Sequence, residues 1–360
     1  MNALAAQPER VLLIRPSALG DVCRTVPVLA SLRRAWPRAR IDWMVQKGFE
    51  GAVEAHPDLL ANGGGVVEFD RKRFGRWFSP AAQGALLEWL RGLRRTRYDV
   101  VIDAQGLLRS GLLTRATGAP VRVGFADARE GGWIGYTHRV KVPGDGHTVD
   151  SMLALPSAVG VEPVKDLRLH ADAAELAAVD AATGFGGKRF AVLAPTSRWA
   201  SKQWNDGRYV EVGRDLLDNR GFEHIVIVGG PREARQVPAL CAWAESDRAG
   251  VTNLIGVTSV ACLMAVVARS ALLIGSDSAA VHMAVGFDRP CVALYGPTDV
   301  ARVGPAVGGV TNTAPVVVVQ RLNPGESLRV GGHKDPEPGR TLMSRITTGD
   351  VIDAACCATR

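Results

Sequence analysis

Short apolar runs alternate with longer amphipathic segments along this chain of 360 residues. Runs rich in Val, Ile and Leu predict buried strands, and apolar residues three or four positions apart predict helices. The strands expected in the first half are Val11–Arg15, Ile41–Gln46, Val66–Phe69, Val100–Ala104 and Val121–Phe125, and the helices are Thr25–Ala35 and Ala81–Arg95. This alternation is typical of a parallel sheet with helices on both faces.

The second half begins the same pattern again. Its expected strands are Phe190–Ala194, His224–Val228, Leu272–Gly275 and Cys291–Tyr295, and its expected helices are Tyr209–Asn219, Ala234–Ala244, Val260–Arg269 and Ala279–Val285. Residues 322–340 are rich in Gly, Pro and charge and are expected to form a loop before a terminal helix from Thr348. The pattern therefore predicts an α/β protein built from two doubly wound units.

The join between the two units is expected within residues 171–188, where an Ala/Asp/Glu-rich stretch runs into a Gly-rich one. We assign residues 1–175 to a first domain and 185–340 to a second, and expect the terminal helix, 345–360, to pack back on the first. Two such sheets facing each other would leave a cleft at the carboxyl ends of their strands. Open α/β sheets bind their ligands there.

The composition describes a globular chain with a mean hydropathy of +0.05. No apolar run approaches the roughly 18 residues of a membrane-spanning helix, and the N-terminus lacks the layout of a signal peptide. The chain is expected to stay in the cytoplasm. Its 6 cysteines form no Cys-x-x-Cys motif and do not cluster with His, so reduced thiols and no structural metal are expected.

The positive charge is concentrated in the first half. Residues 1–150 contain 22 Lys and Arg against 15 Asp and Glu, a balance of +7, whereas residues 151–360 contain 21 of each. A basic half is either a solvated face or a surface for an anionic partner such as a phospholipid membrane or a phosphorylated substrate. The basic clusters lack the motifs that read bases, so no nucleic-acid partner is expected.

Candidate chemistry begins in the turn after the first strand, 16–22, which lacks the glycine patterns of phosphate loops. Asp21 lies near the start of the expected helix. It is either a helix cap or a carboxylate that removes a proton from an incoming hydroxyl. Asp103 and Gln105 lie where the fourth strand opens into a turn. They either bind sugar hydroxyls or hold Arg15 in place, or they form a turn stabilised by the Asp side chain.

In the second half, two hydroxyls and two cations follow the strand Phe190–Ala194. They are Thr196, Ser197, Arg198 and Lys202. This composition suits the binding of phosphate oxygens, with Lys202 as a point charge. The alternative is a surface loop whose Trp residues pack locally.

The strand Leu272–Gly275 opens through Ser276, Asp277 and Ser278 into a helix of small residues. The free backbone N–H groups and partial positive charge of a helix N-terminus form an anion site, and a diphosphate fits it. Asp277 can cap this helix. His282, one turn further along, either reaches the same anion or is a structural residue.

Glu233 follows a Gly-Gly strand exit, Gly229-Gly230. A carboxylate at this position could accept hydrogen bonds from both ribose hydroxyls of a nucleotide. Compensation of a helix dipole is the alternative role for Glu233.

Together these segments resemble glycosyltransferase family 9, the bacterial heptosyltransferases, and most of all the heptosyltransferase I type. The resemblance rests on motifs that run in order through residues 10–300. They are Arg15-Pro16-Ser17-Ala18-Leu19-Gly20-Asp21-Val22, Asp103-Ala104-Gln105-Gly106-Leu107, Gly124-Phe125 with Ala128-Arg129-Glu130, His147-Thr148-Val149-Asp150, Pro195-Thr196-Ser197-Arg198-Trp199 with Lys202 and Trp204, Ser276-Asp277-Ser278 with His282, and Tyr295-Gly296-Pro297-Thr298.

The resemblance implies a GT-B fold of two Rossmann-like domains, with the acceptor held by the first and the nucleotide-sugar donor by the second. It implies inverting transfer, with no essential metal or other cofactor, and the chain indeed has no Asp-x-Asp motif. The donor implied is ADP-heptose. The acceptor implied is an anionic, lipid-linked glycan of the lipopolysaccharide inner-core type, which would bring the protein into peripheral contact with the inner face of the cytoplasmic membrane.

The resemblance and the chemistry together assign a role to each candidate. The expected catalytic residues are Asp21, as base, and Lys202. The expected donor-binding residues are Thr196, Ser197, Lys202, Glu233, Asp277, Ser278, Ala279, Ala280 and His282. The expected acceptor-binding residues are Arg15, Ser17, Asp103, Gln105 and Arg129. Two alternatives stay open, a sugar-nucleotide epimerase of similar fold and a non-catalytic protein that binds nucleotide sugars.

Overall fold

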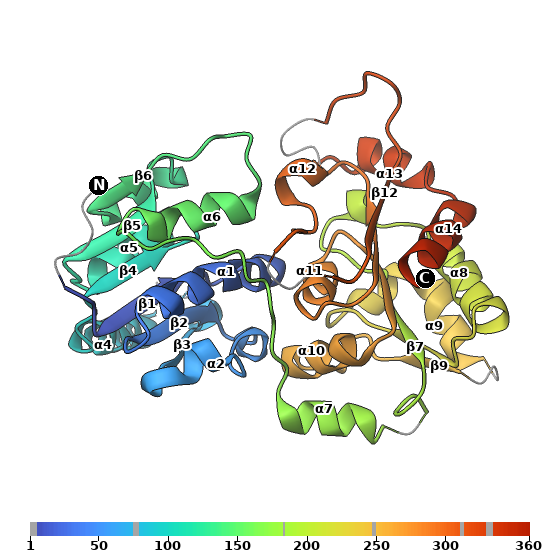
Figure 1. Cartoon of the computed structure of the whole chain (residues 1–360), viewed down its shortest axis with the longest axis horizontal. Coiled ribbons are helices and arrows are strands. Elements are labelled where there is room, and N and C mark those ends of the chain that lie inside the picture. Colours follow the sequence, from blue (N-terminus) through green and yellow to red (C-terminus); the bar gives the residue numbers. More distant parts are fainter. Residues whose placement is uncertain (1–5, 75–78, 183, 247–249, 310–312, 329–333) are drawn as a thin grey trace. The chain divides into compact units, whose positions relative to one another are not determined.

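The chain divides into two compact units, Met1–His170 and Ala171–Arg360 (Figure 1). A computed structural model describes residues 6–74, 79–182, 184–246, 250–309, 313–328 and 334–360. No helix in these described segments is long and apolar enough to cross a lipid bilayer. Each unit is an α/β domain, and the two are described separately below.

The first unit contains a six-stranded parallel sheet in the order β3-β2-β1-β4-β5-β6. Its strands are β1 (Arg10–Ile14), β2 (Arg40–Gln46), β3 (Gly65–Phe69), β4 (Val100–Asp103), β5 (Val121–Phe125) and β6 (His138–Val140). Its helices are α1 (Leu19–Ala35), α2 (Pro57–Leu60), α3 (Arg71–Phe74), α4 (Pro80–Arg95), α5 (Leu108–Ala116) and α6 (Thr148–Ser157), with 3₁₀ turns η1 (Glu50–Ala52), η2 (Ala61–Gly63) and η3 (Arg129–Gly135). The central strands are apolar throughout because helices cover both faces of a parallel sheet.

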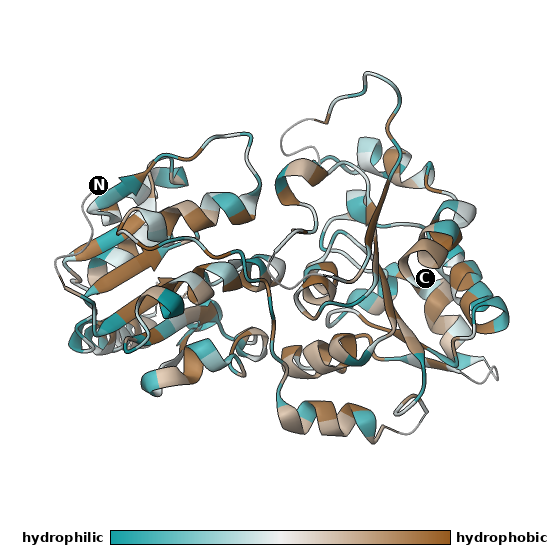
Figure 2. Cartoon of the chain, in the orientation of Figure 1, coloured by the Kyte–Doolittle hydropathy of each residue, from teal (hydrophilic) through white to brown (hydrophobic). Residues whose placement is uncertain are grey.

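The second unit contains a parallel sheet in the order β12-β11-β10-β7-β8-β9. Its strands are β7 (Phe190–Ala194), β8 (His224–Ile227), β9 (Val251–Asn253), β10 (Leu272–Ser276), β11 (Cys291–Tyr295) and β12 (Val316–Gln320). Its helices are α7 (Ala173–Asp180), α8 (Asp206–Asn219), α9 (Pro238–Glu245), α10 (Val260–Arg269), α11 (Ala279–Gly286), α12 (Val300–Val303), α13 (Pro336–Ser344) and α14 (Thr348–Ala358), with 3₁₀ turns η4 (Ala200–Lys202) and η5 (Glu233–Gln236). Brown, apolar strands run through both sheets in Figure 2.

Both sheets have the same topology, because the first strand of each unit lies beside the fourth. β1 pairs with β4 in the first sheet, and β7 pairs with β10 in the second. The chain turns in opposite directions from these two central strands, and this reversal opens a crevice at their carboxyl ends. The candidate residues that the sequence singled out after strands therefore gather at one crevice in each unit.

The expected two-unit α/β fold is confirmed, with differences at its margins. The helix α1 begins at Leu19, six residues before the expected start at Thr25, so Asp21 lies within its first turn. The strands β6 and β9 are only three residues long and carry polar side chains, so no apolar run marked them. The segment 322–340, expected as a loop, contains most of α13, while residues 329–333 lie outside the described part of the chain.

The C-terminal helix α14 packs on the second unit. Its residues Val351, Ala354, Ala355 and Ala358 are buried in a core cluster with Leu216 of α8 and strands of the second sheet. The Trp204 indole also donates a hydrogen bond of 2.9 Å to the Ile346 carbonyl just before this helix. The expectation that helix 345–360 packs back on the first domain is therefore wrong, because its apolar face completes the second core.

Candidate active site

An ion-pair cluster lies at the carboxyl end of β1 in the first unit. Arg15 follows this strand, and its side chain is buried. The guanidinium lies 2.8 Å from Asp21 Oδ2 and also donates to the Ala104 carbonyl at the end of β4. Ala104, rather than Asp103, is therefore the residue that ties Arg15 to the neighbouring strand.

Asp21 also belongs to the N-terminal turn of α1. Its Oδ2 accepts a hydrogen bond of 3.3 Å from the Ala18 backbone N–H, and its Oδ1 pairs with Arg24 one turn along the helix. Asp21 thus stabilises the helix start as expected of a capping side chain, and it also lies between two guanidinium groups. Arg24 was missed in the sequence, although Asp and Arg three residues apart share one face of a helix.

The two arginines control the protonation of Asp21. Burial by itself raises the pKa of the Asp21 carboxyl, but the positive charges and hydrogen bonds of Arg15 and Arg24 outweigh burial and hold this pKa well below its usual range. Asp21 is therefore a carboxylate at every physiological pH. It can accept a proton in a reaction, although it is a weak base in this environment.

Asp103 is fully buried and is bonded within the first unit. One oxygen accepts a hydrogen bond of 2.6 Å from the Tyr136 hydroxyl, and the other accepts from the backbone N–H groups of Gln105 and Gly106. A Cβ at Gly124 would lie 2.3 Å from the Tyr136 ring, so glycine is needed there for this contact. The structure thus shows the turn that the Asp103 side chain stabilises. We withdraw Asp103 from the acceptor-binding residues because its side chain is fully buried.

The remaining acceptor candidates share the edge formed by the loops after β1 and β4. The Gln105 side-chain carbonyl accepts a hydrogen bond of 3.2 Å from the Ser17 backbone N–H, which joins the two loops. Arg129 is exposed at the start of η3, and its backbone N–H donates to the Gly106 carbonyl at 3.0 Å. The structure therefore brings Arg15, Ser17, Asp21, Gln105 and Arg129 to one edge.

A second ion pair lies at the matching position of the second unit. Lys202 ends η4, which follows β7, and Asp277 follows β10. The Lys202 Nζ lies 2.6 Å from Asp277 Oδ2, and these side chains are only 14% and 9% exposed. The pair therefore joins the two loops of the crevice, although its members are far apart in the sequence.

The N-terminus of α11 lies directly after Asp277. Ser278 occupies the N-cap position, and its side chain makes no capping hydrogen bond within the described chain. Asp277 is paired with Lys202 and does not cap the helix, so that expectation is wrong. The N–H groups of Ala279, Ala280 and the next residue have no side-chain cap in the described chain, as an anion site requires. His282 is buried further along α11.

An amide frame holds the loop that carries Thr196 and Ser197. The Gln236 side-chain carbonyl accepts from the Ser197 N–H at 3.3 Å and from the Gln203 amide at 2.8 Å, while that amide also donates to the Ser197 carbonyl. A Cβ at Gly229 would lie 2.9 Å from Thr196 Oγ1. Gln203 and Gln236 were not predicted, because their pairing depends on β8 lying beside β7.

Glu233 begins η5 at the carboxyl end of β8. Its Oε2 accepts a hydrogen bond of 2.6 Å from the Gly230 backbone N–H, and its side chain is half-buried. The carboxylate therefore stabilises its own loop. Glu233 and Lys202 both lie at the carboxyl ends of the strands, because they follow the neighbouring parallel strands β8 and β7.

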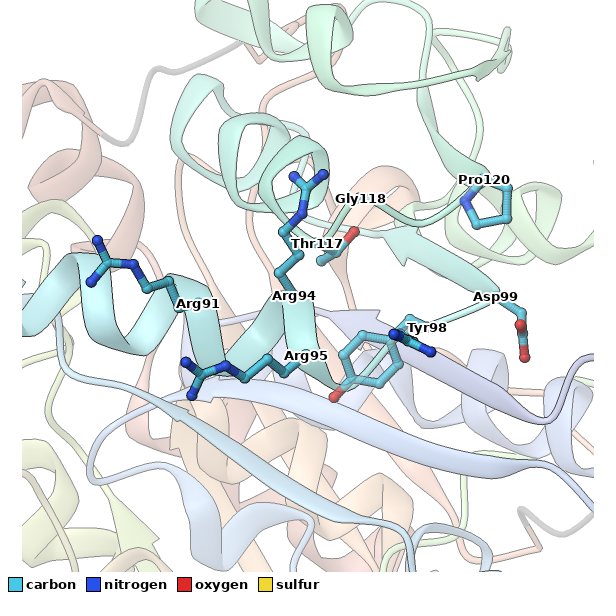
Figure 3. A pocket seen from close by; sticks show the side chains of 9 residues that line it. Arg91, Arg94, Arg95, Tyr98, Asp99, Thr117, Gly118 and Pro120 are labelled. Carbon is cyan, nitrogen blue, oxygen red and sulfur yellow. The ribbon is translucent and has the colours of Figure 1, made fainter.

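The hollow drawn in Figure 3 lies at the amino ends of the strands of the first sheet, opposite the ends that carry Arg15 and Asp21. It measures about 570 Å³ and is lined by residues that precede β4 and β5, including Tyr98, Asp99 and Pro120. Arg15 and Asp21 lie at the carboxyl ends of the strands, so this hollow is not part of the candidate active site.

Comparison with known proteins identifies the class. Residues 86–323 match glycosyltransferase family 9 (heptosyltransferase), and the chain belongs to this family. The protein is therefore a glycosyltransferase, as the sequence motifs predicted.

Its relatives cover nearly the whole chain. The lipopolysaccharide core heptosyltransferase OpsX of Haemophilus influenzae is 25% identical over an alignment of 366 positions, which covers 98% of this chain and 97% of the relative. Lipopolysaccharide heptosyltransferase 1 of Pseudomonas aeruginosa is 28% identical over an alignment of 305 positions, which covers 81% of this chain and 79% of the relative.

A solved structure shows the same fold. It is E. coli heptosyltransferase WaaC with ADP-2-deoxy-2-fluoro heptose, which aligns with a TM-score of 0.73 at 24% identity over 96% of this chain and 98% of its own. This likeness confirms the two-domain α/β architecture of the GT-B type.

Proposed function

We propose that this glycosyltransferase moves a heptose, or a closely related sugar, from ADP-heptose to an acceptor of the lipopolysaccharide inner-core type. The transfer inverts the anomeric centre, needs no essential metal or other cofactor, and takes place in the cytoplasm at the inner face of its membrane. The names of the family and of its lipopolysaccharide-specific relatives support the sugar and the acceptor. The ADP-sugar bound by the E. coli protein supports the donor.

The observation that carries the proposal is the N-terminus of α11 near Lys202, which has no side-chain cap among the residues that the structure describes. A lysine ammonium has three donors, and one of them bonds to Asp277, which leaves two for phosphate oxygens. The helix N–H groups and the hydroxyls of Thr196 and Ser197 add neutral donors. Such preorganised donors stabilise negative charge as it develops on a leaving group.

In the proposed reaction, the acceptor hydroxyl attacks the anomeric carbon on the face opposite the diphosphate. The new bond forms between the hydroxyl oxygen and that carbon, the carbon–oxygen bond to the diphosphate breaks, and its electron pair leaves with ADP. The hydroxyl proton passes to Asp21. Because Arg15 and Arg24 make Asp21 a weak base, this transfer is expected late, when the attacking oxygen has become acidic.

The other candidates bind and orient the substrates. Arg129 is exposed and suits an anionic group of the acceptor, while Ser17 and Gln105 present polar atoms at the same edge. Glu233 has a second carboxylate oxygen for the donor ribose.

A ligand screen tests the donor directly. Binding of the correct nucleotide sugar raises the unfolding temperature by mass action, and ADP-heptose is expected to exceed matched GDP- and UDP-sugars. Equal stabilisation by all three nucleotides would refute ADP specificity.

A turnover assay tests the transfer. Free ADP should appear only when the acceptor glycan is added, with one sugar gained by the acceptor for each ADP. Release of nucleotide without acceptor would favour the epimerase, and donor binding without turnover on any acceptor would favour a non-catalytic protein.

A further inference from the structure

One surface of the first unit displays large apolar side chains to solvent. Among its described residues, Leu108 and Leu112 of α5 are 36% and 51% exposed, and Trp133 and Ile134 of η3 are 39% and 46% exposed. We call these four residues the apolar face. Clustered exposed apolar side chains on a folded domain commonly mark an interaction surface.

The two segments that carry the apolar face, α5 and η3, approach each other closely through their backbones. A Cβ at Gly111 would lie 2.0 Å from the Gly132 carbonyl oxygen, and a Cβ at Gly135 would lie 2.0 Å from the Gly111 carbonyl oxygen. Only glycine permits this approach. The two segments therefore pack directly against each other, and their apolar side chains belong to one surface.

Four exposed arginines lie on the elements that carry the apolar face or next to them. Arg109 and Arg115 belong to α5 itself, and the Arg139 guanidinium lies 4.4 Å from the Trp133 ring centroid. Arg94 of the neighbouring α4 approaches the end of α5, where a Cβ at Gly118 would lie 3.3 Å from its guanidinium carbon. Within the described chain, the ion pairs found include none of these four arginines, so their charge is available to a partner.

The cationic rim continues into the hollow of Figure 3. This hollow is lined by Arg91, Arg94, Arg95 and Arg97, together with Thr117 and Gly118 from the end of α5. In the sequence, residues 71–97 contain eight Lys and Arg against one acid, Glu88, a balance of +7 that equals the net charge of the whole chain. Four of these cations, Arg91, Arg94, Arg95 and Arg97, line the hollow at the end of α5.

We propose that the apolar face and its arginine rim dock this protein on an anionic phospholipid bilayer. Trp133 and its apolar neighbours would enter the headgroup region, where Trp is favoured, and the arginines would bind lipid phosphates. The inference rests on the proposed function in one respect, which is that the acceptor is lipid-linked.

The charge distribution favours a membrane over other occupants. A second copy joined by a two-fold axis would place the arginine rim against itself, which like-charge repulsion opposes. A nucleic acid would match the arginines but not the apolar centre. An anionic bilayer surface satisfies both.

The position of the face agrees with delivery of the acceptor. The helix α5 begins just after the loop that carries Gln105, and η3 begins at Arg129. Both elements therefore start at the candidate acceptor edge. A bilayer bound to this face lies beside that edge, so the glycan of a membrane-embedded acceptor has a short path to Asp21.

Sedimentation with vesicles tests the proposal. Wild-type protein should bind vesicles of phosphatidylethanolamine with about one-third phosphatidylglycerol at low salt, bind purely zwitterionic vesicles much less, and dissociate as salt rises. Leu112→Ser with Ile134→Ser should weaken binding at least about tenfold by removing apolar area. Arg109→Glu with Arg115→Glu should weaken it by a similar factor by reversing charge.

Matched controls place the same chemical changes elsewhere. Val257→Ser with Leu322→Ser replaces exposed apolar residues of the second unit, and Arg38→Glu with Arg214→Glu makes the same change in net charge. The apolar control should bind vesicles as wild type does, and the charge control should lose much less affinity than Arg109→Glu with Arg115→Glu. Thermal unfolding checks that every variant is folded.

Three results would overturn the inference. The first is that variants of the apolar face or its arginines bind vesicles as tightly as wild type. The second is that the charge control, Arg38→Glu with Arg214→Glu, loses as much affinity as Arg109→Glu with Arg115→Glu. The third is that wild type forms a dimer in sedimentation equilibrium and that Leu112→Ser with Ile134→Ser abolishes this dimer. Transfer to a deacylated, water-soluble acceptor separates the two proposals. The variants of the apolar face should retain transfer to this soluble acceptor. If wild type binds vesicles but transfers sugar to no acceptor, the proposed function is refuted and the membrane-docking proposal is not.

Discussion

The two units place different charges at equivalent positions of the same sheet topology. In the first unit, one carboxylate, Asp21, lies between the two guanidinium groups of Arg15 and Arg24. In the second unit, one ammonium, Lys202, pairs with one carboxylate, Asp277, beside the start of α11, for which the described part of the chain supplies no side-chain cap. Each group occupies the crevice of its own unit, at the point where the strand order of that sheet reverses.

This difference separates what the fold supplies from what the loops supply. The strand order puts the loops after β1 and β4, and those after β7 and β10, side by side. The side chains in those loops then decide the chemistry. In the reaction that we propose, the first arrangement keeps one acid ionised for proton transfer, and the second presents donors to a diphosphate.

The largest expected effect comes from removing the carboxylate of the first site. Asp21→Asn cannot accept the hydroxyl proton, so turnover should fall by about 10²–10⁴-fold while ADP affinity, measured by calorimetry, stays nearly unchanged. Asp145→Asn, at an exposed loop position of the same unit, is the matched control and should retain activity. Substantial residual turnover in Asp21→Asn would remove Asp21 as the base.

The next effect comes from the ammonium of the second site. Lys202→Ala should weaken ADP binding by about ten- to a hundredfold, because a charge-assisted hydrogen bond to phosphate is lost. Lys188→Ala changes an exposed lysine just before the same strand, β7, and should leave ADP affinity unaltered. Equal affinities of Lys202→Ala and wild type would place the diphosphate elsewhere.

The low pKa of Asp21 predicts a pH-dependent contribution to stability. A carboxylate whose pKa is depressed in the folded state stabilises the protein above its unfolded pKa of about 4, and this contribution is lost as pH falls further. The difference in unfolding free energy between wild type and Asp21→Asn should therefore be largest at pH 5–7, of order 2 kcal/mol, and shrink towards pH 3. Urea unfolding at several pH values measures it, and a constant difference would contradict the assignment.

A smaller effect is expected at the buried acid of the first sheet. Tyr136→Phe removes a hydrogen bond from Asp103 and should destabilise the protein by about 1–2 kcal/mol in urea unfolding. The acceptor KM should stay unchanged, because Asp103 is enclosed. A raised acceptor KM with unchanged stability would return Asp103 to the acceptor-binding set.

Much of the fold could be predicted from local patterns. The sequence predicted the central strands correctly because strands that helices cover on both faces are almost continuous runs of apolar residues. These strands are β1, β4, β7 and β10. The edge strands β6 and β9 were not predicted because they have few apolar residues, and the edge strand β12 was missed although it contains four valines. The candidate residues after the central strands could also be predicted, since parallel strands end at a shared edge.

The sequence by itself determined two α/β units, their apolar cores and the polar loops that follow their strands. Only the tertiary structure decided which side chains in those loops meet. Lys202 pairs with Asp277, Tyr136 with Asp103, and α14 with the second core. Local patterns record which residues are buried or turn, whereas partners distant in the chain are set by strand order and packing, which depend on every element at once.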